Sequence, residues 1–180
     1  MSHSVRKPRS DMRGVSNIGL LMTLLAWFAV AGLLALAFQD QLERFWNPNP
    51  QVRSTHQGSA IEVVLQPNRQ GHYVATGRIN DERVVFMLDT GATQVAIPPG
   101  VAERLNLARG RAFQVQTANG IATAYATEIA TLQLGDIQLR QVGAHISPGL
   151  EGETILLGMS ALQQLDWSRQ GGELRLRYNP

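Results

Sequence analysis

The stretch VVFMLDTGATQVAIPPG, Val84–Gly100, places one carboxylate, that of Asp89, at the end of an apolar run typical of a buried strand. Because burying an unpaired carboxylate is costly, such a group finds hydrogen-bond donors or takes part in chemistry. Thr90 and Gly91 follow, and a glycine permits the tight turn that would present the carboxylate among backbone N–H groups. The structural alternative is an Asp-turn that only satisfies its own loop.

Short strand patterns, separated by turn signals, surround this stretch from residue 60 onward. Two brief helices are expected at Val101–Leu105, with Pro99 at its start, and at Gly158–Leu165. Turns are expected at Asn80-Asp81, Asn119-Gly120 and Gly135-Asp136. The predicted strands are Ile61–Leu65, His72–Ile79, Arg83–Leu88, Val95–Ile97, Ala112–Gln116, Ile121–Leu134, Ile137–Ile146, Thr154–Leu157 and Glu173–Tyr178. This pattern predicts an all-β barrel or sandwich over residues 60–180.

An apolar segment near the N-terminus, Ile18–Phe38, contains no charged residue. As a helix it would be about 30 Å long, which matches the hydrocarbon thickness of a bilayer. A cleaved signal peptide is the alternative, because Ala35-Leu36-Ala37 resembles a cleavage site, but the apolar run exceeds the usual signal core. We therefore favour a transmembrane helix, followed by a polar, proline-containing tether over residues 39–59.

Charge predicts the orientation of this helix. Residues 1–17 form a basic tail of net charge +3, which places the N-terminus in the cytoplasm by the positive-inside rule. The rest of the chain has 12 basic and 13 acidic residues, so it offers no reason to expect nucleic acid as a partner. The absence of cysteine suits a periplasmic domain held together by its core. We expect a single-pass protein of a bacterial inner membrane.

The chemistry expected of Asp89 requires a second carboxylate. Paired carboxylates share a proton, so one can act as base on a water while the other acts as acid, as is established for aspartic proteases. The sequence has no second Asp-Thr-Gly or Asp-Ser-Gly. Asp136 is followed by Ile and Gln, and Asp166 is followed by Trp and Ser. A two-fold axis would bring together Asp89 from two copies, so an enzyme of this kind is predicted to be a homodimer.

Other kinds of site are not indicated. The histidines, His3, His56, His72 and His145, lack metal-ligand spacing, and no cysteine supports a zinc site. Gly158-Met159-Ser160-Ala161-Leu162 lacks the last glycine of a serine-hydrolase elbow. We expect neither a metal nor an organic cofactor.

At three places the sequence resembles the retropepsin-like aspartic proteases, particularly their membrane-anchored bacterial members. The segments are FMLDTGATQVAIP (Phe86–Pro98), TANG (Thr117–Gly120) and LLGMSALQQLD (Leu156–Asp166). The resemblance, which covers about residues 71–178, implies a small closed β-barrel of the acid-protease type. Three motifs in the family's order are more specific than any one of them.

The resemblance also implies roles for individual residues. Asp89 would be catalytic, within an active-site loop that includes Thr90, Gly91 and Ala92, and Thr90 would lock the two loops of a dimer together. Thr117, Ala118, Asn119 and Gly120 would form the tip of a flap over the substrate. Leu156-Leu157-Gly158 would pack beneath the active-site loop. Met159-Ser160 stands where retroviral enzymes carry an arginine that helps to organise the dimer.

These features predict a membrane-anchored aspartic endopeptidase that acts on peptide or protein substrates as a homodimer. The competing prediction is a catalytically silent β-domain that binds a peptide or an envelope protein in the same groove.

Overall fold

The computed structural model describes residues 17–117 and 120–180. The chain divides into two compact units, Met1–Asp40 and Gln41–Pro180. The basic tail before residue 17 and the expected flap residues Ala118 and Asn119 lie outside the described residues.

The first unit contains most of helix α1 (Asn17–Trp46), and residues 41–46 of this helix are counted in the second unit. Its segment Gly19–Phe38 has a mean hydropathy of 2.4, and none of it is buried. By length and composition this segment can cross a membrane, and a signal sequence would meet the same description.

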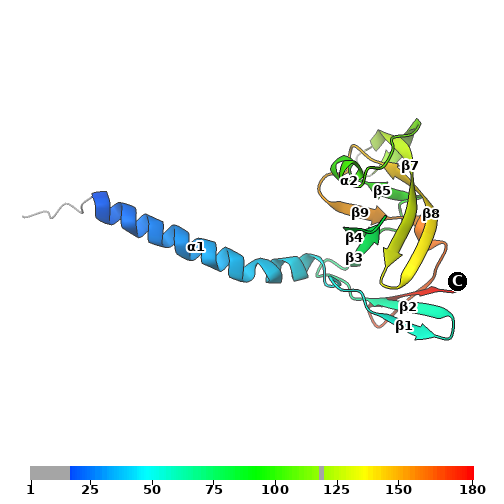
Figure 1. Cartoon of the computed structure of the whole chain (residues 1–180), viewed down its shortest axis with the longest axis horizontal. Coiled ribbons are helices and arrows are strands. Elements are labelled where there is room, and N and C mark those ends of the chain that lie inside the picture. Colours follow the sequence, from blue (N-terminus) through cyan, green and yellow to red (C-terminus); the bar gives the residue numbers. More distant parts are fainter. Residues whose placement is uncertain (1–16, 118–119) are drawn as a thin grey trace, which may run out of the picture. The chain divides into compact units, whose positions relative to one another are not determined.

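The second unit is built almost entirely of strands (Figure 1). A large sheet has the order β3-β4-β9-β5-β8-β7-β6, and an additional pairing joins β3 to β7. Most neighbours are antiparallel, but β4 pairs with β9, and β5 with β8, in parallel. The elements are β3 (Val74–Ile79), β4 (Glu82–Leu88), β5 (Val95–Ile97), α2 (Pro99–Arg104), β6 (Ala112–Thr117), β7 (Gly120–Leu134), β8 (Ile137–Ile146), β9 (Thr154–Leu157) and α3 (Met159–Leu162).

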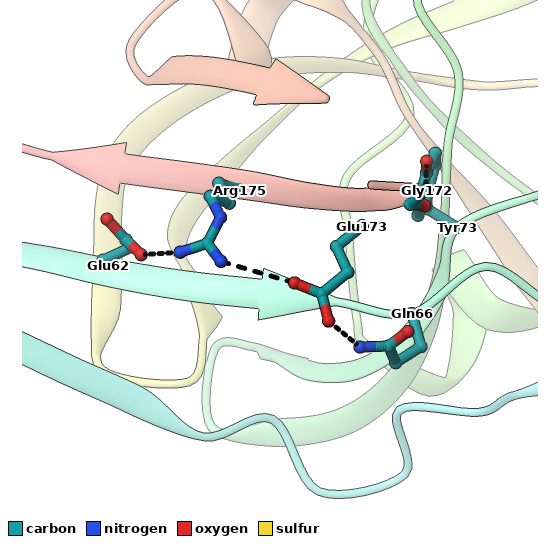
Figure 2. Close-up of polar contacts among 6 residues, drawn as sticks. All are labelled: Glu62, Gln66, Tyr73, Gly172, Glu173 and Arg175. Atoms are coloured by element: carbon teal, nitrogen blue, oxygen red, sulfur yellow. Dashed lines mark hydrogen bonds and ion pairs between the residues drawn. The ribbon is translucent and has the colours of Figure 1, made fainter. Parts of the chain in front are cut away.

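A second, four-stranded sheet has the order β1-β2-β11-β10 and is antiparallel throughout. Its strands are β1 (Ser54–Gln57), β2 (Ala60–Leu65), β10 (Asp166–Gln170) and β11 (Glu173–Tyr178). On one face, polar side chains connect β2 to β11: Arg175 contacts Glu62 at 2.9 Å and Glu173 at 3.4 Å, and Gln66 binds Glu173 (Figure 2). Alternate residues of β11, Leu174 and Leu176, are buried on the other face.

The core follows the alternation of these strands. Branched aliphatic side chains and Phe86 form one buried cluster, to which both sheets and the two short helices contribute. Burial of such apolar surface is the main force that stabilises the fold. Its largest fully buried members are Phe86, Leu65, Ile79, Ile97, Ile129, Leu132, Leu134, Ile137, Leu139, Ile146, Ile155 and Leu157.

The segment expected to be a tether is in part folded onto this unit. Helix α1 continues to Trp46, and β1 occupies Ser54–Gln57. Between them, Asn47 and Asn49 are buried. The Asn49 amide donates to the carbonyl oxygens of Gln66 (2.8 Å) and Val74 (2.7 Å), and its own oxygen accepts from the Gln66 N–H (2.8 Å). These long-range contacts leave no pattern in the local sequence.

The all-β fold class is confirmed, and most predicted strands are present within a residue or two. Asn80 and Asp81 both have positive φ angles, 48° and 67°, as a tight hairpin turn requires. The helix expected at Gly158–Leu165 is shorter, Met159–Leu162. Two strands were not predicted, β1 and β10, because neither has an apolar alternation.

Candidate active site

Asp89 lies immediately after β4, where the parallel pairing of β4 with β9 ends. The register places Leu88 beside Leu157, and the Asp89 N–H donates to the Leu157 carbonyl oxygen at 3.1 Å. A strand in the middle of a sheet thus fixes the backbone that carries the carboxylate.

The turn after Asp89 presents its side chain at the surface of the domain. The Asp89 carbonyl oxygen accepts from the Ala92 N–H at 3.2 Å, and carboxylate Oδ1 accepts from the Gly91 N–H at 2.9 Å. Asp89 is half-buried, whereas Thr90 and Gly91 are exposed. In the described part of the chain the carboxylate makes no other hydrogen bond, so Oδ2 remains available to a water, a substrate or another carboxylate.

The first turn of α3 supports the loop from the other side. Met159 N–H donates to the Ala92 carbonyl oxygen at 2.8 Å, and Ser160 N–H donates to the Thr93 carbonyl oxygen at 3.0 Å. Gly158 makes this approach possible, since a Cβ there would stand 2.6 Å from the Ala92 oxygen. The structure therefore brings Gly158 and Met159 to the back of the active-site loop.

Ser160 was not predicted as a site residue, yet its side chain connects three elements. Its hydroxyl accepts from the Val95 N–H of β5 at 3.1 Å and donates to the Gly143 carbonyl oxygen of β8 at 2.7 Å. Together with its own N–H bond to Thr93, this ties α3 to the segment that follows Asp89. A serine at the start of a short helix carries no sequence signal for such a role.

The hairpin of β6 and β7 carries the residues expected to form a flap. Thr117 pairs with Gly120, the Thr117 hydroxyl donates to the Gly120 carbonyl oxygen at 2.8 Å, and Gly120 has a φ of 108°. Ile121, next to this turn, is 73% exposed. Single exposed apolar side chains are common on protein surfaces, so this exposure alone assigns Ile121 no role.

His145 lies on β8, where it faces the base of the same hairpin. Its ring meets that of Phe113 of β6 edge-on, at 5.9 Å between centroids and 79° between planes. Burial lowers the pKa of His145 below its ordinary value of 6.5. Its Nδ1 atom is buried and has no hydrogen-bond partner among the residues that the structure describes. Burial therefore favours the neutral form of this histidine over the charged form.

Metal binding finds no support within residues 17–117 and 120–180, where no group of three or more His, Asp or Glu side chains could hold an ion.

Comparison with known families assigns the chain to one of them. The family described as "gag-polyprotein putative aspartyl protease" matches residues 75–164, a range that includes the Asp89 loop, the β6–β7 hairpin and Ser160. The chain belongs to this family, that of the retropepsin-like aspartic proteases.

The chain is also similar to individual proteins. An uncharacterized protein encoded in the cobV 5′ region of Sinorhizobium sp. is 30% identical over 171 residues, which are 88% of this chain and 73% of that protein. An uncharacterized protein of Rickettsia prowazekii is 26% identical over 106 residues, 57% of this chain and 45% of that protein. Among solved structures, a retropepsin-like aspartic protease from Rickettsia conorii has the same fold, with a TM-score of 0.53 and 23% identity over 71% of this chain and 95% of that one.

Proposed function

We propose that this protein is a membrane-anchored aspartic endopeptidase whose catalytic site forms between two copies of the chain. The observation that carries the proposal is the Asp89 loop: a single accessible carboxylate stands at a strand end, on a backbone fixed by Leu157, Met159 and Ser160.

The proposed reaction uses one Asp89 from each copy. One carboxylate takes a proton from a water, which attacks the carbonyl carbon of the scissile peptide, and the protonated partner supplies a proton as the tetrahedral intermediate breaks down to the free amine. The pair titrates as a unit, because its two members share one proton. Thr90, exposed on the outside of the loop, is available to bind the same loop of the other copy.

The β6–β7 hairpin is the proposed substrate flap. Thr117 and Gly120 close the described part of its tip, and Ala118 and Asn119 would complete it. Closing a hairpin over a bound peptide excludes water from the reacting bond and positions it. Exposed Ile121 supplies apolar surface that a substrate side chain could cover.

The anchor in this proposal is the segment Gly19–Phe38, uncleaved, with the basic tail in the cytoplasm and the β-domain in the periplasm. Confinement to a membrane raises the effective concentration of one copy relative to another. This effect would help two copies of the chain to form a dimer, although Met159-Ser160 stands where the retroviral enzymes carry the arginine that helps to organise theirs.

The test is digestion of an unbiased peptide library with the full-length protein and two substitutions at opposite ends of β4. Asp89→Asn keeps the shape of the side chain but removes the acid–base group, so hydrolysis should disappear. Asp81→Asn, in the turn before β4, should leave hydrolysis intact, because asparagine also tolerates the positive φ found there. Equal hydrolysis by the wild type and Asp89→Asn would contradict the proposal.

A further inference from the structure

Two arginines face each other across the β3–β4 hairpin. Arg78 of β3 pairs directly with Arg83 of β4, and both residues are exposed. Facing Cα atoms in an antiparallel pair are about 4.5–5.5 Å apart, so the two side chains leave the same face of the sheet as neighbours. Like charges placed directly opposite each other are destabilising. An anion between the two guanidinium groups would relieve this repulsion.

Arginine is paired differently in the smaller sheet. Arg177 of β11 faces Asp166 on β10 and Glu62 on β2, so a carboxylate stands on each neighbouring strand. By contrast, neither Arg78 nor Arg83 forms an ion pair within the described part of the chain. The two facing arginines therefore lack the acidic neighbours that Arg177 has.

The arginine pair borders a hollow of about 240 Å³. Strand β7 forms part of its wall, because Gln133 pairs with Arg78. Pro50 and Val52, from the segment that follows α1, form another part. Among the residues that the structure describes, no acidic side chain lines the hollow. A concave surface lined by charges of one sign attracts ligands of the opposite sign, so this hollow favours an anion.

The two guanidinium groups have donors to spare. Arg78 donates one N–H to the Asp81 carbonyl oxygen at 2.7 Å, which holds its side chain near the hairpin turn. Arg83 makes no side-chain hydrogen bond to any residue that the structure describes. A guanidinium carries several N–H donors in a planar fork, a geometry that matches the oxygens of carboxylates and phosphates.

Two neutral side chains add donors to the same hollow. The Thr76 hydroxyl accepts a hydrogen bond from the Asn47 amide at 2.8 Å, so its own proton can be donated to a ligand. The Gln133 amide donates one N–H to the Gly135 carbonyl oxygen at 3.0 Å and retains a second N–H. The hollow thus combines two positive charges with neutral hydrogen-bond donors.

From this arrangement we infer that the hollow binds a phosphate group, held between Arg78 and Arg83. A phosphate monoester carries a charge of about −1.5 to −2 at pH 7 and several acceptor oxygens, so it can bind both forks and offset both charges. A carboxylate carries one charge, and a single guanidinium satisfies it. Pro50 and Val52 would lie beside the organic part of the ester. A soluble phosphate ester and a phospholipid headgroup both supply this chemistry.

The hollow lies at the far end of β4 from the candidate active site. Arg83 and Asp89 are six residues apart, with β4 extended between them, which corresponds to about 20 Å along the strand. Phosphate binding at Arg83 therefore requires no catalysis by Asp89, and it adds a second kind of ligand to the proposed peptide substrate.

Chemical modification of arginine by phenylglyoxal, measured at each residue by mass spectrometry, tests this site. The full-length protein is kept in dodecyl maltoside micelles, which contain no phosphate, with either inorganic phosphate or chloride at equal ionic strength. At about ten times its dissociation constant, phosphate should slow the modification of Arg78 and Arg83 about tenfold, because only the empty site reacts. Arg111, an exposed arginine just before β6, is the internal control and should react equally in both salts.

A second arm separates the two sources of phosphate. Micelles that contain phosphatidic acid are compared with micelles that contain diacylglycerol, which is the same lipid without its phosphate. Protection by phosphatidic acid alone would assign the site to a lipid headgroup, whereas protection by inorganic phosphate without lipid would assign it to a soluble phosphate. Protection by neither would overturn the inference. Equal protection of Arg111 would also overturn it, because general screening acts on every exposed arginine.

Substitution of one arginine tests whether the two share a ligand. In R83Q, phosphate should no longer protect Arg78, because one guanidinium would be left to hold the group. R83Q also removes the like-charge pair, so the loss of protection would not come from a destabilised hairpin. R111Q is the matched control and should leave the protection of Arg78 as it is in the wild type. Equal protection of Arg78 in R83Q and R111Q would overturn the shared site.

Discussion

Gly158 lies so close to the carbonyl oxygen of Ala92 that a Cβ on Gly158 would be 2.6 Å from that oxygen. The same oxygen accepts the Met159 N–H at 2.8 Å. The contact joins the start of α3 to the loop that carries Asp89, and it leaves no room for a side chain.

We predict that Gly158→Ala destabilises the protein and reduces peptide hydrolysis. The added methyl would also meet the Gln94 carbonyl oxygen, so backbone must move, at a cost of about 1–3 kcal/mol in the free energy of unfolding. Urea unfolding and hydrolysis rates measure the two effects. Gly100→Ala is the control, because a Cβ there meets nothing within 4 Å; an equal response of both variants would contradict the prediction.

Asn49 should contribute strongly to stability despite its place in a segment without regular structure. Asn49→Ala would leave the Gln66 and Val74 carbonyl oxygens without its amide donor, and each buried unsatisfied group costs about 1–3 kcal/mol. Urea unfolding should show the loss. Asn179→Ala, which removes a hydrogen bond from an exposed asparagine, should have a much smaller effect, and a comparable loss in both would disprove this role for Asn49.

His145 should make stability depend on pH. Burial lowers its pKa below the ordinary value of 6.5, so the unfolded chain binds a proton more readily than the folded one. The free energy of unfolding should therefore be highest above pH 6.5 and fall as the pH drops below that value.

Unfolding midpoints at pH 7.5 and pH 5.5 would reveal this dependence, which the substitution His145→Gln should reduce. The exposed His72 provides the comparison, since His72→Gln should leave the pH dependence as it is in the wild type. If His145→Gln leaves the pH dependence of the unfolding midpoint unchanged, then His145 is not the cause of that dependence.

Local patterns were enough to predict the strand that ends just before Asp89. The apolar run before Asp89 and the glycine after it act over a few residues, so they are visible without a structure. Ser160 was missed because its partners, Val95 and Gly143, are distant in sequence.

Strand β10 was missed for a related reason. Asp166–Gln170 has no apolar alternation, and it is a strand because its backbone pairs with β11. Asn47 and Asn49 belong to the folded unit for the same kind of reason, through hydrogen bonds to distant strands.

Local sequence patterns were sufficient to predict an apolar helix near the N-terminus, the short strands that follow it, and one carboxylate at a strand end before a glycine. Hydrophobic periodicity and turn chemistry are local, so they can be read along the chain. The folded arrangement was needed to learn that β9 and α3 hold the loop that carries this carboxylate, and that β10 lies at the edge of its sheet. Those features depend on hydrogen bonds and packing between segments far apart in sequence, which no local pattern records.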